Sequence, residues 1–308
     1  MDLETLLKRN YYELIDNDAA RAVITYIAGH PSAENKGVRF IKGITKVAMH
    51  VHKKKPALTR GLSERLLVYT IEALTLLDRG ELDGLHEDQV QKMEGHLHAY
   101  AGDFAILRYK ENNDVNFVGK ACRHYGESIK LLADIELGYS SCQASKAAKV
   151  SRQMFELTGT VNWAGSWYKN ATKARDLTET FDTNRSQKYH LEAIDAIIAV
   201  AKASKERYEQ TTSLDDAGNW YRAARKAAQM LEPENLTRSA HFYEEAGKAS
   251  KAFAQMSGET QSLLDSLEMY ETALRLVQQV KGVTGPDTRR LQRLYKSISG
   301  EDFSPYQG

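Results

Sequence analysis

Proline, cysteine and long apolar runs are all scarce in this chain. Of its 308 residues only 5 are proline, and four of these fall where a helix would end: Pro31, Pro56, Pro233 and Pro286. Because proline interrupts helices and strands, the long proline-free stretches rich in Ala, Leu, Lys and Glu predict an all-α chain with ample length for a core. Sustained period-two alternation, the mark of a half-buried strand, is missing.

The scarcity of cysteine bears on the compartment. Cys122 and Cys142 have no metal-ligand spacing and form no disulfide framework, which favours a reducing environment. The N-terminal stretch is amphipathic and acidic from its second residue, unlike a signal peptide. No window approaches the apolar length that a membrane span needs. We therefore expect a cytoplasmic protein without a transmembrane segment.

Signatures of catalysis are absent as well. The sequence has no phosphate-binding P-loop, no dinucleotide-binding glycine motif and no nucleophile elbow. Its formal net charge is only +1, which argues against a dedicated nucleic-acid binder. We expect no cofactor and no enzymatic activity.

A short phrase recurs through the last two thirds of the chain. It reads aromatic or apolar, two residues, small, one residue, base, then Ala or an aliphatic residue. The best copies are Tyr168-Ala171-Lys173-Ala174, Tyr221-Ala224-Lys226-Ala227 and Tyr243-Ala246-Lys248-Ala249, and weaker copies begin at Tyr125, Ala144, Ile197 and Tyr270. Copies begin roughly 20–30 residues apart, the length of one helix and a short turn. The repeat predicts stacked helices, and such stacks are usually binding surfaces.

Helical geometry gives the phrase a physical meaning. At about 100° per residue, Tyr168, Ala171 and Ala174 share one arc, and Lys173 points to the opposite side. We predict that the aromatics and alanines pack between helices, where small residues allow close approach. The bases then face water.

The expected fold is an all-α, right-handed solenoid of about a dozen antiparallel helices. An N-terminal helical region (1–112) precedes the repeat array (113–282) and a short C-terminal helix with its tail (283–308), all in one rigid body. Before the array, helices are expected at 2–15, from Ser32 to the basic run, and at 87–110. In the array, Ser213 and Glu234 are expected near helix starts, and Gly258 near an end.

The repeated bases suggest a binding site. If neighbouring helices are antiparallel, alternate copies lie in the same layer. One layer then carries Lys130, Lys173, Lys226 and Arg275. On a concave face these side chains would form a basic ladder for an acidic peptide or helix. The alternative is that they are simply solvated.

Two other features have competing interpretations. The run from His50 to Arg60 holds the densest basic cluster, Lys53, Lys54, Lys55 and Arg60. It suits phosphate, RNA or an acidic membrane surface, or it is a helix C-terminus whose cations complement the dipole. Glu94 and His98 stand at i, i+4 spacing, which fits a shared metal ion in a metal-binding bundle or enzyme, or else a surface pair.

The segments Phe242-Tyr243-Glu244-Glu245-Ala246-Gly247-Lys248-Ala249 and Met269-Tyr270-Glu271-Thr272-Ala273-Leu274 resemble tetratricopeptide-like helical arrays. Their Tyr-Glu-x-Ala phrases are also similar to those of the soluble NSF-attachment proteins. The resemblance covers about residues 113–280 and implies a helical-hairpin scaffold, with no particular partner. The expected function is a non-catalytic scaffold or adaptor that captures a peptide or partner helix in a groove.

Overall fold

The computed structural model describes residues 17–30, 32, 37–54, 56–59, 61–80, 86–282 and 285–300. Within these ranges the regular structure is entirely helical. The helices are α2 (Asn17–Gly29), α3 (Val38–Lys54), η1 (Pro56–Thr59), α4 (Ser63–Asp78), α5 (Glu87–Asn112), α6 (Asn116–Leu132), α7 (Leu137–Thr158), α8 (Val161–Thr178), α9 (Thr183–Thr211), α10 (Leu214–Leu231), α11 (Leu236–Ser257), α12 (Thr260–Lys281) and α13 (Pro286–Ser299). The expected helix at 2–15 lies outside the described residues. No described helix is long and apolar enough to cross a membrane.

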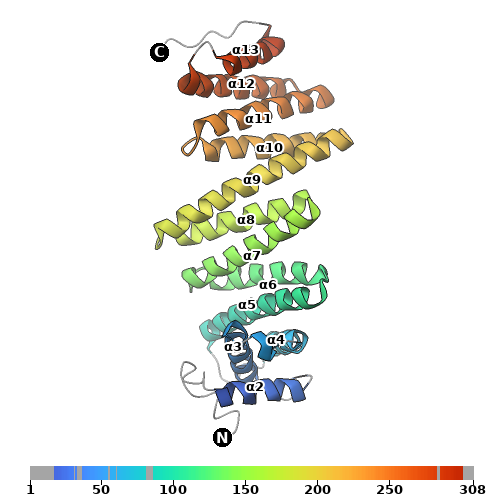
Figure 1. Cartoon of the computed structure of the whole chain (residues 1–308), viewed down its shortest axis with the longest axis vertical. Helices are drawn as coiled ribbons and strands as arrows, with labels where there is room; N and C mark the ends of the chain where they lie inside the picture. The colour runs from blue at the N-terminus through green and yellow to red at the C-terminus, as the bar shows by residue number, and fades with distance from the viewer. Residues whose placement is uncertain are drawn as a thin grey trace. The chain divides into compact units, whose positions relative to one another are not determined.

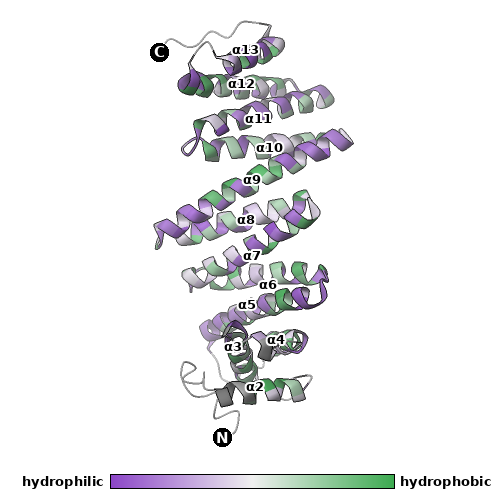
Figure 2. Cartoon of the chain, viewed as in Figure 1, coloured by the Kyte–Doolittle hydropathy of each residue, from purple (hydrophilic) through white to green (hydrophobic). Residues whose placement is uncertain are grey.

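The predicted class, an all-α fold of stacked antiparallel helices, is confirmed. Between α11 and α12, the hydroxyl of Ser250 donates to the carbonyl of Ser262 at 2.7 Å, and that of Ser266 donates to the carbonyl of Gly247 at 2.8 Å. One residue number rises as the other falls, so the two helices are antiparallel. In Figure 1, α10 to α13 follow one another as successive rods. Figure 2 shows polar and apolar residues mixed along each helix, as expected for amphipathic helices packed on neighbours.

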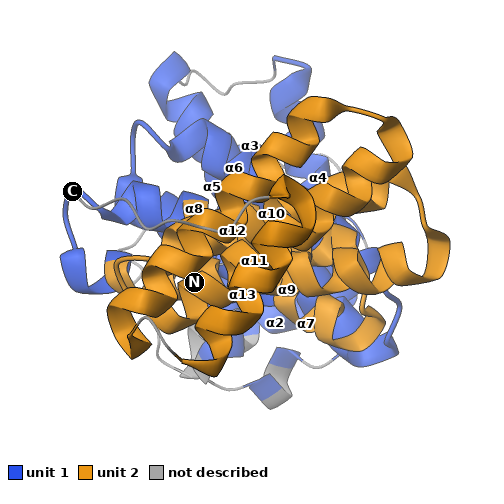
Figure 3. Ribbon diagram, turned by 90° about the horizontal axis from the view of Figure 1, so that it is seen from above, with its two compact units in different colours: residues 1–150, 173–186 blue, residues 151–172, 187–308 orange. Residues whose placement is uncertain are grey.

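The chain divides into two compact units (Figure 3). Unit 1 comprises residues 1–150 and 173–186, and unit 2 comprises residues 151–172 and 187–308. The chain passes between them within α7, α8 and α9. The expected boundaries at 112 and 282 concern the extent of the repeated phrase and stay predictions.

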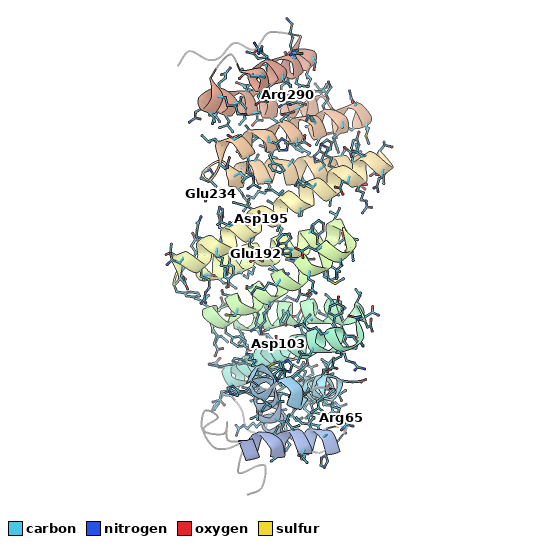
Figure 4. All side chains as sticks on the ribbon, in the orientation of Figure 1. Arg65, Asp103, Glu192, Asp195, Glu234 and Arg290 are labelled. Carbon is cyan, nitrogen blue, oxygen red and sulfur yellow. The ribbon has the colours of Figure 1, made fainter. Side chains whose placement is uncertain are left out.

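Unit 1 depends on close contact between α5 and α6. Gly95 and Gly102 of α5 are buried, and a Cβ atom on Gly102 would lie 2.6 Å from Cε1 of Tyr125 on α6. The hydroxyl of Tyr125 donates to Asp103 at 2.8 Å, and Lys146 donates to both carboxylate oxygens at 2.7 Å. Asp103, labelled in Figure 4, therefore ties α5, α6 and α7 together.

The repeated phrase packs largely as predicted. Its small residues are fully buried: Ala171, Ala174, Ala224, Ala227, Ala246 and Ala249. The aromatic rings of Tyr125, Tyr243 and Tyr270 are buried too. Tyr168 and Tyr221 are only half-buried, although the hydroxyl of Tyr221 still reaches Asp265 on α12 at 3.3 Å.

Helix ends follow local capping chemistry. Ser213 caps α10 as predicted, because its side chain accepts from the backbone N–H of Asp216. At α11 Glu234 lies next to the start as predicted, and the capping residue is its neighbour Asn235, whose side chain accepts from Arg238 N–H at 3.0 Å. Gly258 ends α11 with a φ of 73°, as expected for a C-terminal glycine. The helix expected to start at Ser32 begins instead at Val38, the first residue of its buried face.

Candidate functional site

An open groove runs across unit 2 between α8 and α10, with α9 beneath it. Its volume is about 690 Å³. Helix α8 contributes Val161, Asn162, Gly165, Ser166, Tyr168 and Lys169, α9 contributes Ile197 and Val200, and α10 contributes Asn219, Arg222, Ala223 and Lys226.

Helical spacing explains why these residues share one surface. On α10 the lining positions 219, 222, 223 and 226 follow the i, i+3, i+4, i+7 pattern of a single face. On α8 the positions 161, 165, 168 and 169 do the same. Ile197 and Ala223 are the buried floor, with exposures of 5% and 3%. The groove thus has an apolar floor between two polar walls.

The walls are strongly cationic. Lys169, Arg222 and Lys226 are exposed at the rim, and no carboxylate lines the groove. Among the residues that the structure describes, none of these three cations has an ion-pair partner. Arg222 donates from Nη2 to the side-chain oxygen of Asn219 at 2.9 Å, which orients its guanidinium group along the wall. Unpaired cations beside an apolar floor favour an anionic, partly apolar ligand.

Gly165 of α8 has no side chain, and this widens the groove. Gly165 lies inside α8, and a Cβ atom built on it would meet no atom within 4 Å. A mid-helix glycine costs about 1 kcal/mol relative to alanine, so packing within unit 2 does not explain its presence.

A second hollow continues the groove toward the start of α8. Its volume is about 280 Å³, and it shares Val161 and Asn162 with the groove. Its charges are mixed, because Glu206 and Arg207 both line it. Arg207 is also paired with Asp216 at 3.1 Å. Of these two hollows, only the main groove has charged lining residues that are all cationic.

The structure places the predicted ladder residues as follows. All four are exposed, Lys130 and Lys173 in unit 1 and Lys226 and Arg275 in unit 2. Lys130 contacts Glu127 at 2.8 Å, and Arg275 lies 3.9 Å from Glu232. Of the four, only Lys226 lines the groove. The ladder as a whole stays a prediction.

Sequence reasoning missed Lys169 and Arg222. Each directly follows the leading tyrosine of a repeat copy, as Tyr168-Lys169 and Tyr221-Arg222. The third copy has an acid there, Glu244 after Tyr243. Comparing the residue that follows the tyrosine in each copy would have shown that two of these three copies carry a base there.

The basic run from His50 to Arg60 is only partly described by the structure. Lys53 is exposed, and the Nδ1 atom of His52 lies 2.7 Å from the hydroxyl of Thr59. The side chain of Lys54, with Lys55 and Arg60, lies outside the described residues. The basic run therefore stays a prediction.

The Glu94–His98 pair adjoins a second histidine. Oε1 of Glu94 is 3.9 Å from Nε2 of His98, and Nδ1 of His98 is 2.9 Å from Nδ1 of His124. Burial, followed by the charge of His98, lowers the pKa of His124 to about 4. The described residues contain no group of three or more His, Cys, Asp or Glu arranged to hold a metal.

Together, the fold and the groove define an all-helical protein of stacked hairpins with a basic, apolar-floored groove. No protein-family model and no curated protein matches the chain. Among solved structures it is similar to the nuclear import adaptor Nro1 of S. pombe, at 10% identity and a TM-score of 0.40, with 96% of each chain covered. A circular tandem repeat protein aligns at 12% identity and a TM-score of 0.27, covering 96% of this chain and 63% of that one. Alignments with scores this low add nothing to the assignment of function.

Proposed function

We propose that this protein is a non-catalytic scaffold or adaptor that binds an acidic segment of a partner protein in the groove between α8 and α10. The observation that supports it best is the composition of the groove: three exposed cations, no carboxylate and an apolar floor. A partner segment with both acidic and apolar side chains would complement these surfaces.

Charge reversal tests the proposal. A random peptide library is selected on the wild-type protein, and the enriched peptides are then measured on the double variant Arg222→Glu/Lys226→Glu. We expect acidic residues to be enriched, and affinity to fall about tenfold, since each exposed charge pair contributes up to about 1 kcal/mol.

The matched control is Lys188→Glu/Lys202→Glu. Both lysines are exposed on α9 in the same unit and do not line the groove, and the net charge changes equally. This control should bind as the wild type does. Selected peptides without an acidic excess, or equal losses in the two double variants, would refute the proposal.

A further inference from the structure

We infer that the occupant of this groove is an amphipathic α-helix of the partner, which crosses α8 at Gly165. This inference rests on the function proposed above and adds the conformation of the ligand and the position that selects it.

The shape of the groove suits a helix. Its lining extends from Val161 to Lys169 along α8 and from Asn219 to Lys226 along α10. At 1.5 Å per residue these stretches are about 12 Å and 10 Å long, or roughly two helical turns. A third helix lying between two others buries an apolar stripe against the floor and leaves its polar sides at the rim.

Backbone hydrogen bonding also favours a helical ligand. Beyond the first turn of α8, the lining residues lie inside helices, whose backbone groups are paired internally, so they offer no strand edge to an extended peptide. The uncharged hydrogen-bonding groups along the walls are few: Asn162, Ser166, Tyr168 and Asn219. Asn219 already accepts from Arg222. A helical ligand satisfies its own backbone and needs none of them.

In this arrangement the ligand helix comes closest to α8 at Gly165. Its absent side chain leaves open space above the floor, although alanine would make α8 more stable. Glycine at a helix crossing lets two backbones approach closely. A ligand helix lying against Gly165 would fill this open space.

The cations then determine how the ligand is oriented about its own axis. Lys169 and Lys226 end the lining stretches of α8 and α10, and Arg222 lies one turn before Lys226. An apolar stripe on Ile197, Val200 and Ala223 places the flanking positions of the ligand beside these three cations. Acidic residues are expected at those flanking positions.

Two synthetic peptides distinguish the conformations. Both contain 14 residues, with the same numbers of Leu, Ala and Glu. One has Leu at i, i+3, i+4 and i+7, and the other alternates Leu with Glu or Ala. Fluorescence anisotropy of labelled peptides measures both affinities. We expect the helical-period peptide to bind at least about tenfold more tightly, because the alternating peptide has no single apolar stripe as a helix.

Substitutions at Gly165 test the contact point. Gly165→Leu is expected to weaken the helical-period peptide at least about tenfold, and Gly165→Ala severalfold, through steric exclusion. Gly165→Ala should unfold at an equal or higher temperature than the wild type. The matched control is Gly126→Ala in α6, where a Cβ atom also meets nothing within 4 Å. It should leave peptide binding unchanged.

The outcomes separate the two proposals. Tighter binding of the alternating peptide, or undiminished binding by Gly165→Leu, would overturn the helical ligand and leave the acidic-segment groove standing. If the library of the previous section yields charge-sensitive binders but the helical-period peptide does not bind, the helical inference again fails alone. If neither the library nor either peptide binds in low salt, both proposals fail.

Discussion

Gly102 lets α5 and α6 pack closely because it has no side chain. A methyl group there would lie 2.6 Å from the ring of Tyr125, and that ring is held in place by its hydroxyl bond to Asp103. We expect Gly102→Ala to lower the free energy of unfolding by about 1–3 kcal/mol. Urea denaturation measures the change.

The control for this prediction is the same substitution at a position with free space. Gly126→Ala adds its methyl group where no atom lies within 4 Å, so it should raise the free energy of unfolding by up to about 1 kcal/mol through helix propensity. Effects of the same sign at the two sites would show that contact with Tyr125 is not the cause.

Asp103 connects α5 to two neighbouring helices through its carboxylate. Its carboxylate is 15% exposed and accepts hydrogen bonds from both Lys146 and Tyr125. Asp103→Ala leaves an ammonium group and a hydroxyl without their acceptor, and we expect a loss of about 2–4 kcal/mol in unfolding free energy. Thermal or urea unfolding should show it, whereas Asp134→Ala, at an exposed position after α6, should change stability by less than about 0.5 kcal/mol.

At the scale of helices, the sequence predicts most of what the structure contains. Period and capping residues located α10 and α11 to within a residue or two, because both signals are local. The start of α3 was missed, since Ser32 is a good capping residue but the apolar face begins at Val38. Local signals place α10 and α11 well, and at α3 the start of the buried face decides where the helix begins.

Helix α11 shows what local signals cannot reveal. Glu244 and Glu245 would be read as its polar side, yet they are only 2% and 7% exposed. The cations that pair with them are Lys248 on the same helix, Lys205 on α9 and Arg290 on α13. Arg290 is labelled in Figure 4. Burial alone would raise the pKa of Glu244, but hydrogen bonds from Arg290 and Lys248 lower it overall. The partners are distant in sequence, and the pattern of one helix cannot indicate them.

This network makes α13 depend on α11. In Glu244→Gln, Arg290 loses its charged partner on α11 and keeps the 3.8 Å contact with Asp287 on its own helix, and we expect a loss of about 1–3 kcal/mol in stability, moderated by the partial exposure of Arg290 and Lys248. Hydrogen exchange should quicken in α13 more than in α10. Glu271→Gln, at an exposed position on α12, is the control and should change neither quantity. Unaltered exchange in α13 of the first variant would contradict the proposed connection.

At the scale of the whole molecule, the groove combines residues that the sequence separates. Tyr168 with Lys169, and Tyr221 with Arg222, come from two copies of one phrase, but their convergence depends on α8 and α10 lying on either side of α9. The phrase predicted exposed bases, and Lys226 is one of them. It grouped Lys226 with Lys130, Lys173 and Arg275, and it did not indicate Lys169 or Arg222 as neighbours of Lys226, because such neighbours depend on how consecutive hairpins stack.

The two units also differ in their titratable groups. The four described histidines whose pKa is lowered, His52, His96, His98 and His124, all lie in unit 1. Burial is the main cause in each, and for His124 repulsion from protonated His98, Arg123 and Lys120 adds to it while Glu127 opposes it. Glu127 and Asp78 oppose the shift at His98. In unit 2 the lowered pKa values are those of buried carboxyl groups, Glu244 and Glu245, together with Asp287.

These shifts have different consequences for stability. A histidine with a lowered folded-state pKa favours the folded state fully above pH of about 6.5, its unfolded value. That stabilisation is lost as the pH falls toward the folded value, because the unfolded chain takes up the proton first. A carboxyl group with a lowered pKa keeps its stabilisation until the pH falls below about 4.5. Burial raises the pKa of Glu94 in unit 1, and this group acts in the opposite sense to the four histidines.

We therefore expect mild acid to loosen unit 1 before unit 2. Between pH 7 and pH 5, unit 1 should lose about 1–2 kcal/mol of stability, a value reduced for the partial exposure of His124. Hydrogen exchange, corrected for its intrinsic pH dependence, should report faster opening of α5 and α6 at pH 5 and little change in α11 and α12. Replacing the titrating group by His124→Gln should shrink the difference, since the contact with Nδ1 of His98 no longer depends on protonation at position 124. Equal loosening of both units, or a full acid response in His124→Gln, would show that the buried histidines do not control this behaviour.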